Sequence, residues 1–209
     1  ISFYYVWVNG KLLGYNQGSK TAAEWDITDV LSEGENVVAL EVYRWSSGAY
    51  LECQDMWRLS GIERDVYLYS QPKAALKDFR ITSTLDDSYK NGVFALNVDL
   101  RNHRPAATNL TLAYELLDAQ GKVVATEEKT TYVPVNETRT LSFDKNLTDV
   151  HTWTSEHPNL YKLVMTVKEE GKVNEIIPFN VGFRRIEIKP IDQLSLIHIS
   201  EPTRRTPIS

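Results

Sequence analysis

The stretch SFYYVWVNGKLLGY, residues 2–15, decides the fold class of this chain. Residues 2–8 are a run of aromatic and β-branched residues, which favour strands, and residues 11–15 are a second apolar run. Asn9 and Gly10 separate the two runs, and both tolerate the positive φ angles that a two-residue type I′ turn requires. The stretch therefore predicts a β-hairpin.

The rest of the chain repeats this pattern of short apolar runs separated by turn residues. Residues 37–45 alternate inward Val, Leu and Val with outward residues, as a half-buried strand does. From Ala75 onward, turn residues recur about every 8 to 12 residues, which is typical of a β-sandwich. No segment keeps an apolar period of 3.6 residues, so we expect an all-β fold without long helices. Further strands are expected at residues 23–27, 65–70, 77–85, 93–102, 109–117, 122–130, 138–143, 160–168, 174–179 and 182–189.

Composition excludes several classes of protein. The 209 residues are 42% hydrophobic and 24% charged, as in ordinary globular proteins. A net charge of -5 argues against nucleic acid as a partner, because phosphate binding needs clustered Lys and Arg. No apolar run approaches the roughly 20 residues needed to cross a bilayer. The single Cys53 excludes an internal disulfide and a cysteine-only metal site.

The beginning of the chain bears on localisation. Ile1 lies in the middle of a strand-like pattern, so we expect that the natural start precedes it. The absence of a signal peptide therefore says nothing about secretion, and the choice between cytoplasm and periplasm stays open.

The stretch LECQDMWRLSG, residues 51–61, is the candidate functional loop. It is too polar for a core strand, and it is too rich in Leu, Met and Trp for a solvent-exposed loop without a function. Glu52 and Asp55 are weak candidates for a catalytic pair, because they lie three residues apart in a loop, whereas catalytic carboxyl pairs project from rigid elements toward one substrate. Asp55 either takes part in a binding site, caps a turn or pairs with Arg58.

Four stretches carry a resemblance to a known family. They are VWVNGKLLGYNQGS (6–19) continuing into AEWD (23–26), RWSSGAY (44–50) running into residues 51–65, WTSEHPNLY (153–161) and VGFR (181–184). In this order and spacing the chain resembles the non-catalytic N-terminal part of family 2 glycoside hydrolases, and most closely the large bacterial β-galactosidases.

The resemblance implies a domain order. Residues 1–72 would be the C-terminal part of an incomplete jelly-roll β-sandwich of the galactose-binding type, and residues 75–189 an immunoglobulin-like β-sandwich. A (β/α)₈ barrel with both catalytic glutamates would follow, so no catalytic residue is expected in this chain. Residues 190–209 would be a truncated linker and a non-native tail, since residues 194–209 resemble a translated sequencing adapter and show no match to a partner strand.

The resemblance also implies a function for the parent protein. It would hydrolyse terminal non-reducing β-D-galactosides with retention of configuration, use Mg²⁺ and Na⁺, and form a homo-oligomer. The chain alone would be inactive and hold no cofactor. Asp55 would bind a monovalent cation and a hydroxyl of the galactosyl unit, because a carboxylate offers acceptor oxygens to both.

The other residues of the loop are expected to support Asp55. Glu52, Trp57 and Arg58 would form its scaffold, and Cys53 stands where relatives often carry Asp.

A separate expectation concerns the connection at residues 132–139 of the immunoglobulin-like domain. This connection is short, which argues against its completing the active site of a neighbouring subunit.

Two alternatives remain open at this point. One is a stand-alone β-sandwich module for carbohydrate binding or adhesion. The other is a fragment of a related β-glucuronidase or β-mannosidase, although the Gln-Asp-Met-Trp stretch at residues 54–57 favours a β-galactosidase.

Overall fold

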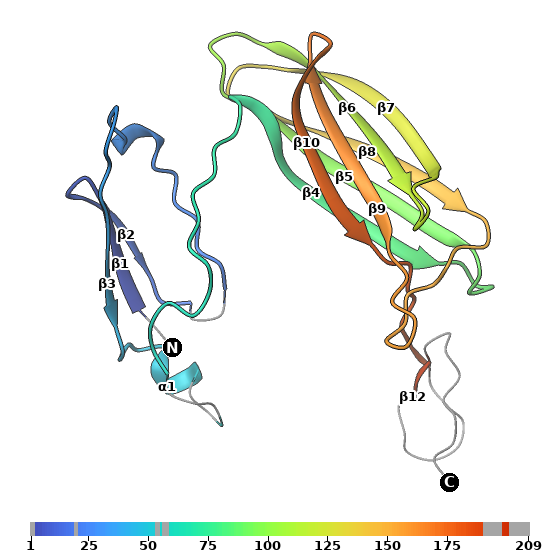
Figure 1. Ribbon diagram of the computed structural model, residues 1–209, viewed down its shortest axis with the longest axis horizontal. Helices are drawn as coiled ribbons and strands as arrows, with labels where there is room; N and C mark the ends of the chain where they lie inside the picture. The colour runs from blue at the N-terminus through green and yellow to red at the C-terminus, as the bar shows by residue number, and fades with distance from the viewer. Residues whose placement is uncertain (1–2, 19–20, 53–54, 56–58, 190–197, 201–209) are drawn as a thin grey trace. The chain divides into compact units, whose positions relative to one another are not determined.

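The computed structural model describes residues 3–18, 21–52, 55, 59–189 and 198–200. The chain divides into two compact units, Ile1–Tyr69 and Ser70–Ser209. Their regular structure is almost entirely β-strand (Figure 1), which confirms the predicted fold class. A 3-10 helix, η1 (Thr28–Val30), and one short α-helix are the exceptions in the described part.

The first unit contains one antiparallel sheet in the order β2-β1-β3. Its strands are β1 (Phe3–Val8), β2 (Lys11–Asn16) and β3 (Val38–Tyr43). Asn9 and Gly10 have φ angles of 51° and 77°, as the two-residue turn requires. The predicted hairpin is confirmed.

One face of this sheet is covered by Trp25. A Cβ on Gly14 would lie 2.8 Å from the Trp25 ring, so only glycine leaves room for it. The indole Nε1 donates a hydrogen bond to the hydroxyl of Tyr4 at 3.4 Å. Residues 23–27 thus lie over the sheet instead of joining it, and the strand predicted there is wrong.

Two further expectations for this unit are also wrong. Val38, Leu40 and Val42 of β3, predicted to point inward, are 56%, 36% and 37% exposed, because β3 is an edge strand with no second sheet over it among the described residues. Residues 65–70 form no strand, since no described strand pairs with them. An alternating pattern predicts an extended chain, but burial requires an opposing layer.

The other face of the sheet carries a cluster of aromatic rings. Their centroids lie 4.9–6.2 Å apart, and the ring pairs are either edge to face or tilted, with interplanar angles of 43–79°. Tyr43 Oη also donates to Glu41 Oε1 at 2.7 Å, and this hydrogen bond raises the pKa of Tyr43. The members of the cluster are Phe3, Tyr5, Trp7, Tyr15 and Tyr43.

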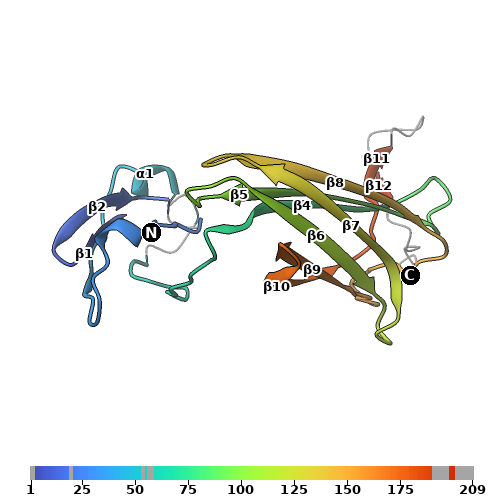
Figure 2. The same cartoon turned by 90° about the horizontal axis from the view of Figure 1, so that it is seen from above.

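The second unit is a sandwich of two antiparallel sheets (Figures 1 and 2). One sheet has the order β4-β5-β8 and the other the order β10-β9-β6-β7. This is the arrangement of an immunoglobulin-like sandwich. The strands are β4 (Ala74–Leu85), β5 (Gly92–Asn102), β6 (Thr108–Leu117), β7 (Val123–Val133), β8 (Thr138–Leu147), β9 (Tyr161–Glu169) and β10 (Lys172–Val181).

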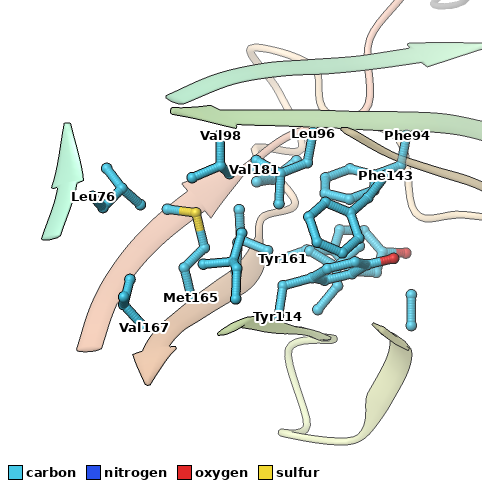
Figure 3. Packing of buried hydrophobic residues seen from close by; sticks show 14 of the residues in the cluster. Leu76, Phe94, Leu96, Val98, Tyr114, Phe143, Tyr161, Met165, Val167 and Val181 are labelled. Atoms are coloured by element: carbon cyan, nitrogen blue, oxygen red, sulfur yellow. The ribbon is translucent and has the colours of Figure 1, made fainter. Parts of the chain in front are cut away.

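The core of the sandwich follows from the period of two. Every second residue of β5, β6 and β9 points between the sheets. Side chains from β5 on one sheet therefore pack against side chains from β6 and β9 on the other (Figure 3). Phe94, Tyr114 and Phe143 form the aromatic centre of this core, with centroid distances of 5.3 and 5.6 Å. Burial raises the pKa of the Tyr114 hydroxyl.

The connection between β7 and β8 is short, as predicted, and spans residues 134–137. It is held by Asn102, which is fully buried. The Asn102 side chain donates to Ala106 O and Val133 O, and its main-chain carbonyl accepts from the amide of Asn136. Each of these groups therefore has a partner, as a buried amide requires.

Two short strands lie at the end of the described chain. β11 (Glu187–Lys189) pairs antiparallel with β12 (His198–Ser200). The expectation that residues 194–209 would find no partner strand is therefore wrong for these three residues, because their backbone groups can pair whatever side chains they carry.

Candidate functional site

The loop that contains Asp55 begins with a single helical turn, α1 (Ala49–Glu52). The amide of Ala49 donates to Ser46 O, and the amide of Glu52 donates to Gly48 O at 2.9 Å. Ala49 anchors this turn because it is only 4% exposed. Tyr50 and Leu51, by contrast, are 91% and 85% exposed, so the turn presents an apolar surface to solvent.

Gln17, the residue after β2, is hydrogen-bonded to Ser47, which lies just before α1. Ser47 Oγ donates a hydrogen bond to Gln17 Oε1 at 3.2 Å, across 30 residues of sequence. A Cβ on Gly48 would lie 3.7 Å from both Gln17 O and Glu52 Oε1, so these oxygens also lie close to the turn. Sequence reasoning missed Gln17 and Ser47 because nothing in their spacing signals that they meet.

Asp55, the candidate ligand-binding residue of the loop, is among the described residues. It is exposed and has a φ of 54°, in the left-handed region that Asp tolerates better than most residues. No described residue donates a hydrogen bond to its carboxylate or forms an ion pair with it. Among the described residues, none therefore shows Asp55 acting as a turn cap or as an ion-pair partner.

The residues that flank Asp55 in this loop lie outside the described residues, and two of them, Trp57 and Arg58, belong to its expected scaffold. The flanking residues are Cys53, Gln54, Met56, Trp57 and Arg58, so the predicted scaffold and the Arg58 ion pair remain predictions. Glu52 is described and ends α1. Its scaffold role also remains a prediction.

The described residues do not form a complete cation site. No group of three or more His, Cys, Asp and Glu residues lies together in the described ranges. Hard cations take about six or more oxygen ligands, and one carboxylate supplies at most two. The oxygens of Asp55 could therefore be only part of a coordination shell.

The stretch at residues 153–161, one of the four that carry the resemblance, has a structural role. Tyr161 is 6% exposed and packs edge to face on the buried ring of Phe183 at 5.2 Å. The amide of Trp153 donates to Phe183 O, and the guanidinium of Arg184 stacks on the Trp153 ring at 4.9 Å. These aromatic side chains fix the entry into β9.

Within the described ranges, no helix is long and apolar enough to cross a bilayer.

Comparisons with known proteins give the same order of segments. The family described as glycosyl hydrolases family 2, sugar binding domain, matches residues 1–72, and glycosyl hydrolases family 2 matches residues 74–184. The β-galactosidase of Priestia megaterium is 44% identical over 190 residues, which are 90% of this chain and 18% of that protein. The β-galactosidase of Clostridium acetobutylicum is 41% identical over 187 residues, 89% of this chain and 20% of that protein.

A solved structure shows the same fold. The β-glucuronidase of Bacteroides uniformis matches with a TM-score of 0.81 and 21% identity, over 89% of this chain and 23% of that one. The chain thus spans about a fifth of the length of the curated relatives it matches. Since the two family matches cover nearly all of residues 1–184, the chain belongs to glycosyl hydrolase family 2.

Proposed function

We propose that this chain is the N-terminal, non-catalytic part of a retaining β-galactosidase that hydrolyses terminal β-D-galactosides. Residues 1–72 would be the last part of a jelly roll, residues 75–189 an immunoglobulin-like sandwich, and residues 190–209 a truncated linker and a non-native tail. The curated relatives at 44% and 41% identity, both β-galactosidases, support this proposal. The β-glucuronidase supports the fold alone, because its identity is only 21%.

The role of this chain would be to shape the substrate site. The single observation that carries this role is the exposed Asp55 carboxylate, which accepts no hydrogen bond from a described residue. In the whole enzyme Asp55 would accept a hydrogen bond from a galactosyl hydroxyl and share in holding a monovalent cation. Tyr50 and Leu51 would be covered by the catalytic part of the enzyme.

The chemistry would take place elsewhere. Retaining glycosidases use two carboxyl groups about 5 Å apart, one as nucleophile and one as acid and base. We assign neither to this chain. Mg²⁺ and Na⁺, together with assembly into a homo-oligomer, would be properties of the whole enzyme.

Activity and binding assays of the 209-residue chain alone test whether catalysis lies outside this chain. We expect no turnover of a chromogenic β-galactoside and no heat of binding in a calorimetric titration with galactose or lactose. Turnover would refute the proposal that catalysis lies outside this chain. Clear binding without turnover would instead favour a stand-alone carbohydrate-binding module.

Substitution of Asp55 in the whole enzyme tests the proposed contact. Asp55→Asn should lower kcat/KM for a β-galactoside about 10- to 100-fold, the loss expected for one hydrogen bond to a charged group. It should also weaken any dependence of the rate on monovalent cations. Asp29→Asn, at an exposed residue of η1, is the matched control and should leave both unchanged. Equal kinetics in the two variants would remove Asp55 from the site.

A further inference from the structure

The turn between β1 and β2 consists of Asn9 and Gly10, and an Asn-Gly pair is chemically labile. The amide nitrogen of the glycine can attack Cγ of the preceding Asn, because glycine has no Cβ to crowd the approach. A five-membered succinimide ring forms, and the side-chain nitrogen leaves as ammonia together with the proton of the attacking amide. Water then opens the ring at either of its two carbonyls, which gives Asp or isoaspartate. The chain contains a second such pair, Asn91 and Gly92.

The surroundings of Gly10 leave room for this attack. Asn9 and Gly10 are both exposed, and a Cβ on Gly10 would meet no heavy atom within 4 Å. Among the residues that the structure describes, the amide of Gly10 donates no backbone hydrogen bond outside the strands. The attacking nitrogen is therefore neither packed against a side chain nor held in this way.

The second Asn-Gly pair has the opposite surroundings. Gly92 is buried at the start of β5, and a Cβ there would lie 2.9 Å from the ring of Phe183. The side chain of Asn91 donates to Asp86 at 2.8 Å and accepts from the amide of Asp149 at 3.1 Å. The same reaction at Asn91 would thus require the sandwich to open.

The carboxamide of Asn9 joins the hairpin to residues 28–37, here called the η1 segment. Its Nδ2 donates to Val30 O at 2.9 Å and to Asn36 Oδ1 at 2.7 Å. Its Oδ1 accepts from the amide of Val37 at 2.9 Å, and the main-chain amide of Asn9 donates to Val37 O at 2.9 Å. The side-chain bonds span 21 to 28 residues of sequence, so one side chain fixes a distant segment on the hairpin.

Deamidation would remove the donor on which this connection depends. The two groups that face Nδ2 are both acceptors: Val30 O is a carbonyl, and Asn36 Oδ1 already accepts from the amide of Ser32 at 2.8 Å. A carboxylate has acceptor oxygens only, so two attractive contacts would become repulsions between oxygens. Isoaspartate would also lengthen the main chain of the turn by one methylene group.

We propose that Asn9 is a site of spontaneous hydrolytic deamidation and that the reaction releases the η1 segment from the hairpin. The ring forms only while the hydrogen bonds of Asn9 are open, and a three-stranded sheet opens at a lower free-energy cost than the sandwich does. This inference goes beyond the function proposed above and is independent of it, since it rests on contacts within the first unit.

Incubation of the intact, unaltered chain at mildly alkaline pH tests the modification. Peptide mapping by mass spectrometry separates the Asn, Asp and isoaspartate forms of each pair. We expect conversion at Asn9 to be at least about tenfold faster than at Asn91, because the latter waits for the sandwich to open. Isoaspartate should be among the products, since direct hydrolysis of the side chain gives Asp alone. Equal rates at the two pairs, no conversion at Asn9, or Asp as its sole product would overturn the proposed modification.

Two variants of the intact chain test the release of the η1 segment. Glu33 and Glu35 are exposed in this segment and offer cleavage sites to a protease that cuts after Glu. Asn9→Asp should speed cleavage there about tenfold or more, the effect of losing two hydrogen bonds. Asn16→Asp is the matched control, because Oδ1 of Asn16 accepts from the amide of Gly18 at 3.0 Å and a carboxylate keeps that bond. Equal cleavage of the two variants would overturn the release, and the incubation of the unaltered chain does not depend on the folding of either variant.

Discussion

Both units of this chain contain strands with alternating apolar residues, but these residues are buried in one unit and exposed in the other. In the sandwich, β5 buries Phe94, Leu96, Val98 and Leu100 completely. In the first unit, β3 has the same alternation of apolar residues, yet all six of its residues are exposed. The difference lies in the layer above the strand, because a second sheet faces β5 and none faces β3 among the described residues.

This comparison shows that an apolar pattern and a hydrophobic core are different things. The buried hydrophobic residues of the described first unit are Val6, Val8 and Ala49, whereas the sandwich has a continuous core. A sheet of three strands is at the lower limit of independent stability, and a two-layer sandwich is well above it. We therefore expect the sandwich to be the stable part of the chain.

The largest expected difference between the units is in native-state hydrogen exchange. Amides of β5, β6 and β9 should exchange roughly a thousandfold or more slowly than those of β1 and β3, because only the former require global unfolding. Exchange monitored by NMR or mass spectrometry on the intact chain measures this ratio. Equal protection in the two units would break the comparison.

The next largest effect is expected from one substitution made in both units. Leu112→Ala removes a completely buried side chain from β6 and should lower the free energy of unfolding by about 2–5 kcal/mol. Leu40→Ala on β3 removes a side chain that is 36% exposed, and should cost less than about 1 kcal/mol. Urea titrations followed by circular dichroism give both values. Similar losses in the two variants would mean that β3 is buried in solution.

The smallest expected effect concerns the turn after β4. Asp86 accepts hydrogen bonds from the hydroxyl and amide of Ser88 and from Asn91, and these lower its pKa from 3.8 to about 2. Because the folded pKa is the lower one, the stabilisation is complete above pH 3.8 and is lost as the pH falls toward 2. Asp86→Ala should thus lower the melting temperature of the sandwich by a few degrees at pH 7, and by much less at pH 2, where about half of the folded carboxyls are protonated.

A matched variant in the first unit sharpens this test. Asp26 forms a similar turn, in which its Oδ1 accepts from the amide and hydroxyl of Thr28. Asp26→Ala should leave the melting of the sandwich unchanged at both pH values, because the residue belongs to the other unit. An Asp86→Ala defect that is as large at pH 2 as at pH 7 would show that its cause is not the carboxylate's charge.

Much of the fold could be predicted from local patterns. The Asn9 and Gly10 turn and the strands of the sandwich follow from turn residues and a period of two, and they are present in the structure. The exception is the strand expected at residues 182–189, of which only residues 187–189 form a strand. The strands expected at residues 23–27 and 65–70 were wrong because a strand needs a partner, and pairing is not encoded in one segment alone. Asp55 was picked out by sequence, but the hydrogen bond from Ser47 to Gln17 was not.

The sequence by itself determined the fold class, the hairpin and the membership of glycosyl hydrolase family 2, because these follow from local periodicity and from short stretches in a fixed order. The tertiary structure alone decided which apolar faces are buried and which side chains meet. Glu175 lies 104 residues beyond Gln71, yet the two share a hydrogen bond. Burial and long-range hydrogen bonds depend on residues far apart in the chain, so no single stretch contains the information that specifies them.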